Sequence, residues 1–136
     1  MEKQISLKTL PEFTKQEVFE YVVTNLLKQG EKSILPNSVE RCGYRGKDGK
    51  KCAAGFIISD EEYKKTFEGK TFQAMSVDFF QDGYFGYNER QEKYHFKLIE
   101  ELQKVHDNYT VSCWIGQFND LADYFSLDKT FLEAYY

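Results

Sequence analysis

Apolar residues recur at helical spacing near the start of the chain. The stripe consists of Val18, Phe19, Val22, Val23, Leu26 and Leu27. Thr14 and Glu17 stand before it with the spacing of a capping box, in which the hydroxyl accepts from the Glu17 amide while the glutamate reaches back. Gly30 supplies a stop signal. The pattern predicts a helix that begins after Thr14 and ends near Gly30.

The segment from Arg41 to Ile58 has the pattern of a β-hairpin. Asp48-Gly49 is a pair that tolerates positive φ in a tight turn, and it lies between two short arms. We therefore expect two antiparallel strands. The second arm, from Cys52 onward, also fits the entry of a buried helix, because its first residues are small.

The rest of the chain is mainly helical in pattern. We expect a short helix from the capping box at Ser59, a helix over 71–80, a loop over 81–88, a long helix over 89–105, a helix after Ser112 and a last turn at Asp128. This order lacks βαβ alternation. The expected fold class is α+β: a mostly helical single domain, residues 1–136, with a small antiparallel β-hairpin.

Composition favours a folded protein of the cytoplasm. The 12 Phe and 10 Tyr argue against disorder, and the net charge of −4 argues against nucleic acid as a partner. No apolar run approaches the roughly 18 residues that cross a bilayer. Met1–Gln4 lacks the apolar run of a signal peptide. In the cytoplasm the three cysteines would be reduced thiols.

An unusual density of aromatic residues marks the predicted loop. Tyr84, Phe85 and Tyr87 lie around Gly86, outside any helical stripe. Rigid rings on a loop suit a protein interface or the stacking of a base. The alternative is that they fold back and close the core. We expect Tyr84, Phe85 and Tyr87 to be partly exposed and to bind a partner.

Positive charge gathers in the predicted hairpin of this acidic protein. The residues are Arg41, Arg45, Lys47, Lys50 and Lys51. A local cationic surface could receive a phosphate or an acidic partner. We therefore expect these side chains to contribute to binding, with a small anionic ligand as one candidate.

The candidate catalytic chemistry is sparse. A cysteine hydrolase needs a thiol near a histidine and an orienting acid. Cys42 or Cys52 could form such a set with His106 and Asp107, and Cys113 could pair with His106. The set built around Cys52, His106 and Asp107 is the one we take as the alternative. A zinc half-site from Cys42 and Cys52 has nine intervening residues, longer than the usual spacing, and both thiols suit a packed hairpin. His95 lies on the same predicted helix as His106, too far along it to share a metal. We expect no metal, no cofactor and no catalytic residues.

Several motifs carry a resemblance across most of the chain. They are a helix ending in Leu-Leu-x-Gln-Gly (26–30), a Cys-x-Tyr-Arg-Gly turn with Gly-x-Lys-Cys-Ala-x-Gly (42–55), Asp60 to Tyr63, Glu68-Gly69, and Leu-Gln-x-x-His-Asp (102–107) before Trp114. The chain resembles a group of small uncharacterised proteins of bacteria and their phages, and departs from them over 71–93. The resemblance implies a related fold and a phage or prophage origin, and no established activity.

These observations favour a non-enzymatic binding protein. It would inhibit or sequester a host factor in the host cytoplasm, as small phage-borne proteins that antagonise host defences do. The expected partners are a host protein or a small anionic ligand, with a second copy of the chain as a further candidate, and no membrane. The rival hypothesis is a small cysteine- or metal-dependent hydrolase.

Overall fold

The computed structural model describes residues 4–38 and 41–135, and these residues form helices, turns and irregular segments without a β-strand. The α-helices are α1 (Lys15–Gln29), α2 (Ala53–Ile57), α3 (Phe72–Phe80), α4 (Gly83–Lys93), α5 (Phe96–Asn108) and α6 (Val111–Tyr124). Short 3-10 helices lie at Leu10–Glu12, Lys47–Gly49, Lys65–Phe67 and Thr130–Tyr135. The first residues, from which we expected no signal peptide, lie mostly outside these ranges.

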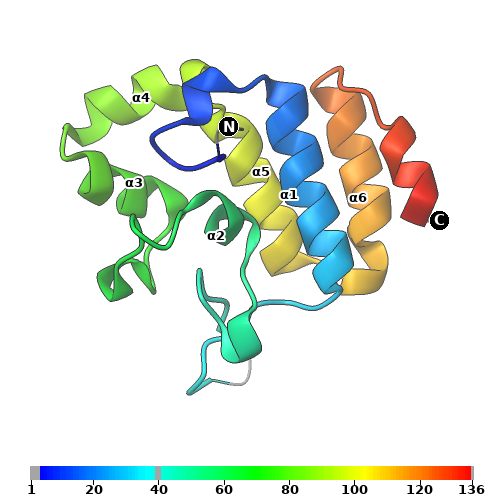
Figure 1. Cartoon of the computed structure of the whole chain (residues 1–136), viewed down its shortest axis with the longest axis horizontal. Helices are drawn as coiled ribbons and strands as arrows, with labels where there is room; N and C mark the ends of the chain where they lie inside the picture. Colours follow the sequence, from blue (N-terminus) through cyan, green and yellow to red (C-terminus); the bar gives the residue numbers. More distant parts are fainter. Residues whose placement is uncertain (1–3, 39–40, 136) are drawn as a thin grey trace.

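Helix α5 is the centre of the arrangement. Figure 1 shows α1, α5 and α6 side by side, with α3 and α4 forming an arm on the other side of α5. Helix α2 packs against both α1 and α5. The buried side chains of α5 are Phe96, Leu98, Ile99, Leu102, Val105 and His106. Because α5 contacts helices on several sides, its buried residues belong to one hydrophobic core that runs from Ile5 to Leu132 in sequence.

The prediction of the first helix is confirmed. The Thr14 hydroxyl accepts from the Glu17 amide at 3.1 Å, and the Glu17 carboxylate accepts from the Thr14 amide at 2.8 Å. Gly30 ends α1 in the left-handed conformation with φ of 65°. These local interactions satisfy backbone groups that a helix end leaves unpaired, which is why the sequence signal was sufficient.

The predicted β-hairpin between Arg41 and Ile58 is absent, so the α+β fold class is wrong. The described residues contain a single isolated bridge, between Ile34 and Cys42, and the second arm folds into α2 instead. The turn chemistry was correct, since Asp48 and Gly49 have φ of 57° and 75°. The arms do not pair as strands because the small residues after Cys52 form a helix that is buried against α1 and α5. Alanine has the highest helix propensity, which favours this outcome.

The chain between residues 81 and 95 also differs from expectation. The predicted loop over 81–88 is the first half of α4, and the predicted long helix over 89–105 is broken before α5. The break occurs at His95, whose φ is 60°. The His95 Nε2 atom lies 2.7 Å from the Phe13 carbonyl oxygen, which ties the break to the segment before α1. This contact between distant segments has no local signal.

No helix among the described residues has the length and apolar character needed to cross a membrane.

Candidate functional site

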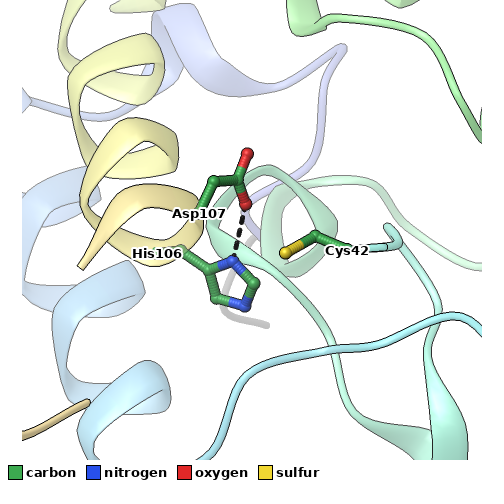
Figure 2. Close-up of side chains that lie close together, drawn as sticks. All are labelled: Cys42, His106 and Asp107. Atoms are coloured by element: carbon green, nitrogen blue, oxygen red, sulfur yellow. Dashed lines mark hydrogen bonds and ion pairs between the residues drawn. The ribbon is translucent and has the colours of Figure 1, made fainter. Parts of the chain in front are cut away.

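Among the described residues, Cys42, His106 and Asp107 form a close group of side chains of the kind that can ligate a metal (Figure 2). Cys42 comes from the bridged segment opposite Ile34, and the other two residues come from the last turn of α5. One ligand atom from each lies within 4.8 Å of the others. The sequence left Cys42, Cys52 and Cys113 as candidates for this role, and Cys52 was the one preferred. Cys52 lines the neighbouring cavity, but the structure brings Cys42 to His106 and Asp107.

The His106 ring is buried and both of its nitrogens are engaged. The Ser33 backbone N–H donates to Nε2 at 3.0 Å, and Nδ1 lies 2.8 Å from the Asp107 Oδ1 atom. Because a backbone N–H can only donate, Nε2 must carry the lone pair and Nδ1 the proton of the neutral ring. Trp114 packs against the ring with 5.5 Å between centroids. These contacts fix the tautomer and orientation of His106.

Asp107 is held in its charged form. Burial alone would raise the pKa of this carboxyl, but hydrogen bonds from His106 and Gln103, and a further one from Cys42, outweigh it and lower the pKa below the ordinary value. Gln103 Nε2 donates to Asp107 Oδ1 at 2.9 Å. The carboxylate is therefore a hydrogen-bond acceptor at neutral pH.

Neither cysteine of this region has the character of an activated nucleophile. Burial, together with the adjacent Asp107 charge, raises the pKa of the Cys42 thiol to about 11. Burial raises the pKa of Cys52 to about 12. The reactive form of cysteine is the thiolate, so both groups are largely unreactive thiols at neutral pH. In addition, His106 has no free nitrogen with which to accept a thiol proton.

The same hydrogen bonds make the group a poor metal site. Cysteine, histidine and aspartate are all zinc ligands, and their atoms are close enough to converge. A metal at Nδ1 of His106 would leave the ring proton on Nε2, where it would face the Ser33 N–H. Two donors would then oppose each other in a buried position, which is costly. The arrangement fits a buried structural network better than a metal centre.

A cavity of about 380 Å³ opens beside this network. Its wall consists of Arg41, Cys42, Gly43, Tyr44, Cys52, Gly69, Lys70, Thr71, Phe72, Gln103 and Asp107. The contact between Gln103 and Asp107 was not predicted from the sequence. The two residues are four positions apart on one helix, a spacing that places them on the same face. That spacing is the signal from which their contact could have been found.

The aromatic residues of α4 divide into two groups. Tyr84 and Phe85 are 66% and 77% exposed, whereas Tyr87 is buried. The Tyr87 ring packs 5.7 Å from the Phe96 ring, between centroids. The expectation of partial exposure is therefore confirmed for Tyr84 and Phe85 and wrong for Tyr87. The reason is that the expected loop is the first half of α4, which packs against α5 and brings the Tyr87 ring to Phe96.

Most of the predicted basic side chains have partners within the chain. Arg45 donates to the carbonyl oxygens of Gly55 at 2.9 Å and Ile58 at 2.7 Å, which ties its guanidinium to the C-terminal half of α2. Lys50 pairs with Glu31 at 3.1 Å, and the Lys51 ammonium lies 5.9 Å from the centre of the Phe56 ring. Arg41 and Lys47 are exposed. That the five residues bind a partner stays a prediction.

Comparison with known proteins does not assign a family or a function to the chain. No family model, curated protein or solved structure matches the chain. The resemblance to small bacterial and phage proteins therefore stays a prediction.

Proposed function

We propose that this chain is a non-enzymatic binding protein that acts by occupying the surface of a partner protein through Tyr84 and Phe85. The observation that carries the proposal is the exposure of these neighbouring rings, 66% and 77%, at the start of α4. Large aromatic side chains are the commonest energetic anchors of protein interfaces. Their exposure leaves apolar area in water, and a partner would remove that cost.

The backbone that carries the two rings is well supported. The Arg90 guanidinium pairs with the Asp82 carboxylate, so that residues before and within α4 are linked. The same guanidinium stacks 3.7 Å from the centre of the Phe80 ring, at the end of α3. With Tyr87 anchored in the core, the exposed rings are presented from a fixed helix. Pre-organisation of this kind reduces the entropy lost on binding.

The chemistry of the Cys42–His106–Asp107 network also supports a binding role over the hydrolase hypothesis. Its thiol is protonated at neutral pH, and both nitrogens of its histidine are already hydrogen bonded. A small cysteine-dependent hydrolase would need a histidine free to accept the thiol proton. Inhibition or sequestration of a host protein, with the chain encoded by a phage, is the form of the proposal that fits the sequence resemblance.

The test compares two variants with matched exposure. Tyr84→Ala/Phe85→Ala should keep the melting temperature of the wild type but lose the partner captured from bacterial lysate. Loss of one central anchor typically weakens binding by about 2 kcal/mol or more, roughly thirtyfold. Tyr124→Ala is the control, because Tyr124 is 67% exposed at the end of α6, away from α4. This control should retain the partner.

Two results would contradict the proposal. Equal capture by the double variant and the wild type would place the interface elsewhere. Unfolding of the double variant would mean that the rings stabilise the chain itself. Size-exclusion chromatography with light scattering identifies the case in which the partner is a second copy of the chain, since the double variant would then shift from dimer to monomer.

A further inference from the structure

We propose that the cavity beside Asp107 binds a small zwitterionic molecule, with its anionic group on Arg41 and its amine on Asp107. This site is separate from the aromatic surface of α4 and does not depend on it.

Arg41 supplies a cation in the wall of the cavity. Its side chain is exposed and forms no ion pair or hydrogen bond with any residue in the described ranges, 4–38 and 41–135. The backbone of Arg41 is nevertheless fixed, because its N–H donates to the Ser38 hydroxyl at 2.9 Å and its carbonyl accepts from the Leu35 N–H at 2.8 Å. The planar guanidinium matches a carboxylate or phosphate with two parallel hydrogen bonds.

The other cation in the wall is already occupied. Lys70 Nζ lies 3.5 Å from the Asp78 carboxylate. The Arg41 guanidinium lies close to the chain before α3, since a Cβ on Gly69 would be 3.6 Å from an Arg41 nitrogen, which is an ordinary van der Waals contact. Arg41 is thus the cation left for a ligand at this end of the cavity.

Asp107 supplies an anion with one oxygen to spare. Oδ1 accepts from both His106 and Gln103. Figure 2 shows Oδ2 directed away from His106 and Cys42. The hydrogen bonds to Oδ1 hold the carboxylate in position without using Oδ2, so a ligand ammonium could donate to it. A charge-assisted hydrogen bond of this kind is stronger than one between neutral groups.

The balance of charge selects the ligand class. A simple anion would contact Arg41 but would also approach the Asp107 carboxylate, and a simple amine would meet the opposite problem. A molecule that carries both charges can pair its anionic group with Arg41 and its ammonium group with Asp107. The volume of about 380 Å³ lies within the range of small-molecule pockets.

A second cavity leaves room for a larger ligand body. It has a volume of about 520 Å³ and shares Thr71, Phe72, Gln103 and Asp107 with the first, so the two cavities adjoin. Tyr87 and Phe72 contribute apolar surface to its wall. A zwitterion with an apolar side group would therefore extend past Asp107 in this direction.

The test is calorimetric titration of the full chain with zwitterions of two kinds. One arm uses free L-amino acids, which carry a carboxylate, and the other uses O-phosphorylethanolamine, which carries a phosphate. We expect at least one of these probes to bind. Trimethylglycine, which has a carboxylate but no N–H donor, should bind at least about tenfold more weakly than glycine.

Variants separate the two ends of the site. Arg41→Gln should weaken binding of the probe at least about tenfold, whereas Lys97→Gln, at an exposed cation outside both cavities, should leave binding unchanged. Asp107→Asn should also weaken binding of the zwitterionic probe, because it removes the charge proposed to face the probe's ammonium group. Absence of binding by every probe would overturn the proposal, and so would equal binding by wild type and Arg41→Gln. Inorganic phosphate binding as tightly as O-phosphorylethanolamine would overturn the role of Asp107.

Discussion

Glu62 and Glu68 each hold irregular chain in place by accepting hydrogen bonds from several backbone N–H groups. Glu62 is buried and accepts from the backbone N–H groups of Leu7 at 3.0 Å, Lys8 at 3.1 Å and Ser59 at 3.0 Å. A buried charge is costly unless it is paired or hydrogen bonded, and these three donors compensate it. The reciprocal hydrogen bonds of the capping box predicted at Ser59 form, but the short helix expected after it does not, because residues 60–62 are a turn. Glu62 instead anchors the N-terminal segment.

We predict that Glu62→Gln destabilises the fold by about 1–3 kcal/mol. Leu7 and Ser59 both donate to Oε1, while Lys8 donates to Oε2. The amide of glutamine keeps one acceptor and presents an N–H₂ group to the remaining backbone donor. Urea unfolding monitored by tryptophan fluorescence measures the change. Glu61→Gln, at the exposed neighbouring position, should leave the midpoint unchanged; a similar midpoint for both variants would contradict the anchoring role.

The three cysteines should differ strongly in their rates of alkylation. Cys113 is exposed, Cys42 is partly buried with a pKa of about 11, and Cys52 is buried. At pH 8 a raised pKa leaves Cys42 mostly protonated, because the thiolate fraction falls as the pKa rises above the pH. Iodoacetamide labelling followed by peptide mass mapping should modify Cys113 first, Cys42 slowly and Cys52 only after unfolding. Rapid labelling of Cys42 would show that its thiol is activated.

All three cysteines are free thiols, as the sequence predicted. Which of them lies beside His106 could not be predicted. The choice of Cys42 over Cys52 follows from the path of residues 33–42: the Ser33 N–H binds His106, and the bridge between Ile34 and Cys42 then carries the sulfur to α5. These contacts join segments far apart in sequence, and a residue pattern does not encode their geometry directly.

At the scale of elements, helices with complete local signals were predictable. Helix α1 has a capping box, an apolar stripe and a terminal glycine, and α3 begins with the Thr71 hydroxyl accepting from the Ala74 N–H at 3.1 Å. The start of α6 was displaced, since Thr110 stands at its N-cap in place of Ser112. Local hydrogen bonding defines such helix ends to within a few residues.

Elements that depend on tertiary contacts were not predictable in the same way. Helix α2 has five residues, too few to be stable alone, and depends on packing against α1 and α5. Gly55 within it lies so close to Tyr44 that a Cβ would meet the Tyr44 carbonyl oxygen. The sequence shows a glycine there, but its cause is the close approach of another segment. The same holds for the break at His95, which is fixed by Phe13.

At the scale of the whole molecule, α5 and α6 join the core to the His106 network. Trp114 is fully buried, its Nε1–H donates to the Tyr109 carbonyl oxygen at 3.1 Å, and its ring packs on His106. Leu98 is also fully buried, on the opposite end of α5 from His106. The two residues therefore test different parts of one core.

We predict that Leu98→Ala and Trp114→Ala each lower the free energy of unfolding by about 2–5 kcal/mol, because each leaves a cavity that the surrounding side chains fill only in part. Trp114→Ala should fall at the upper end, since it also removes the hydrogen bond to Tyr109 and uncovers His106. Urea unfolding followed by circular dichroism measures both variants, because the fluorescence of the chain's single tryptophan is lost in one of them. Val111→Ala, at a partly exposed position on α6, is the control and should change stability by about 0.5 kcal/mol or less. A midpoint for Leu98→Ala or Trp114→Ala as close to wild type as that of the control would mean that the core does not extend to that residue in solution.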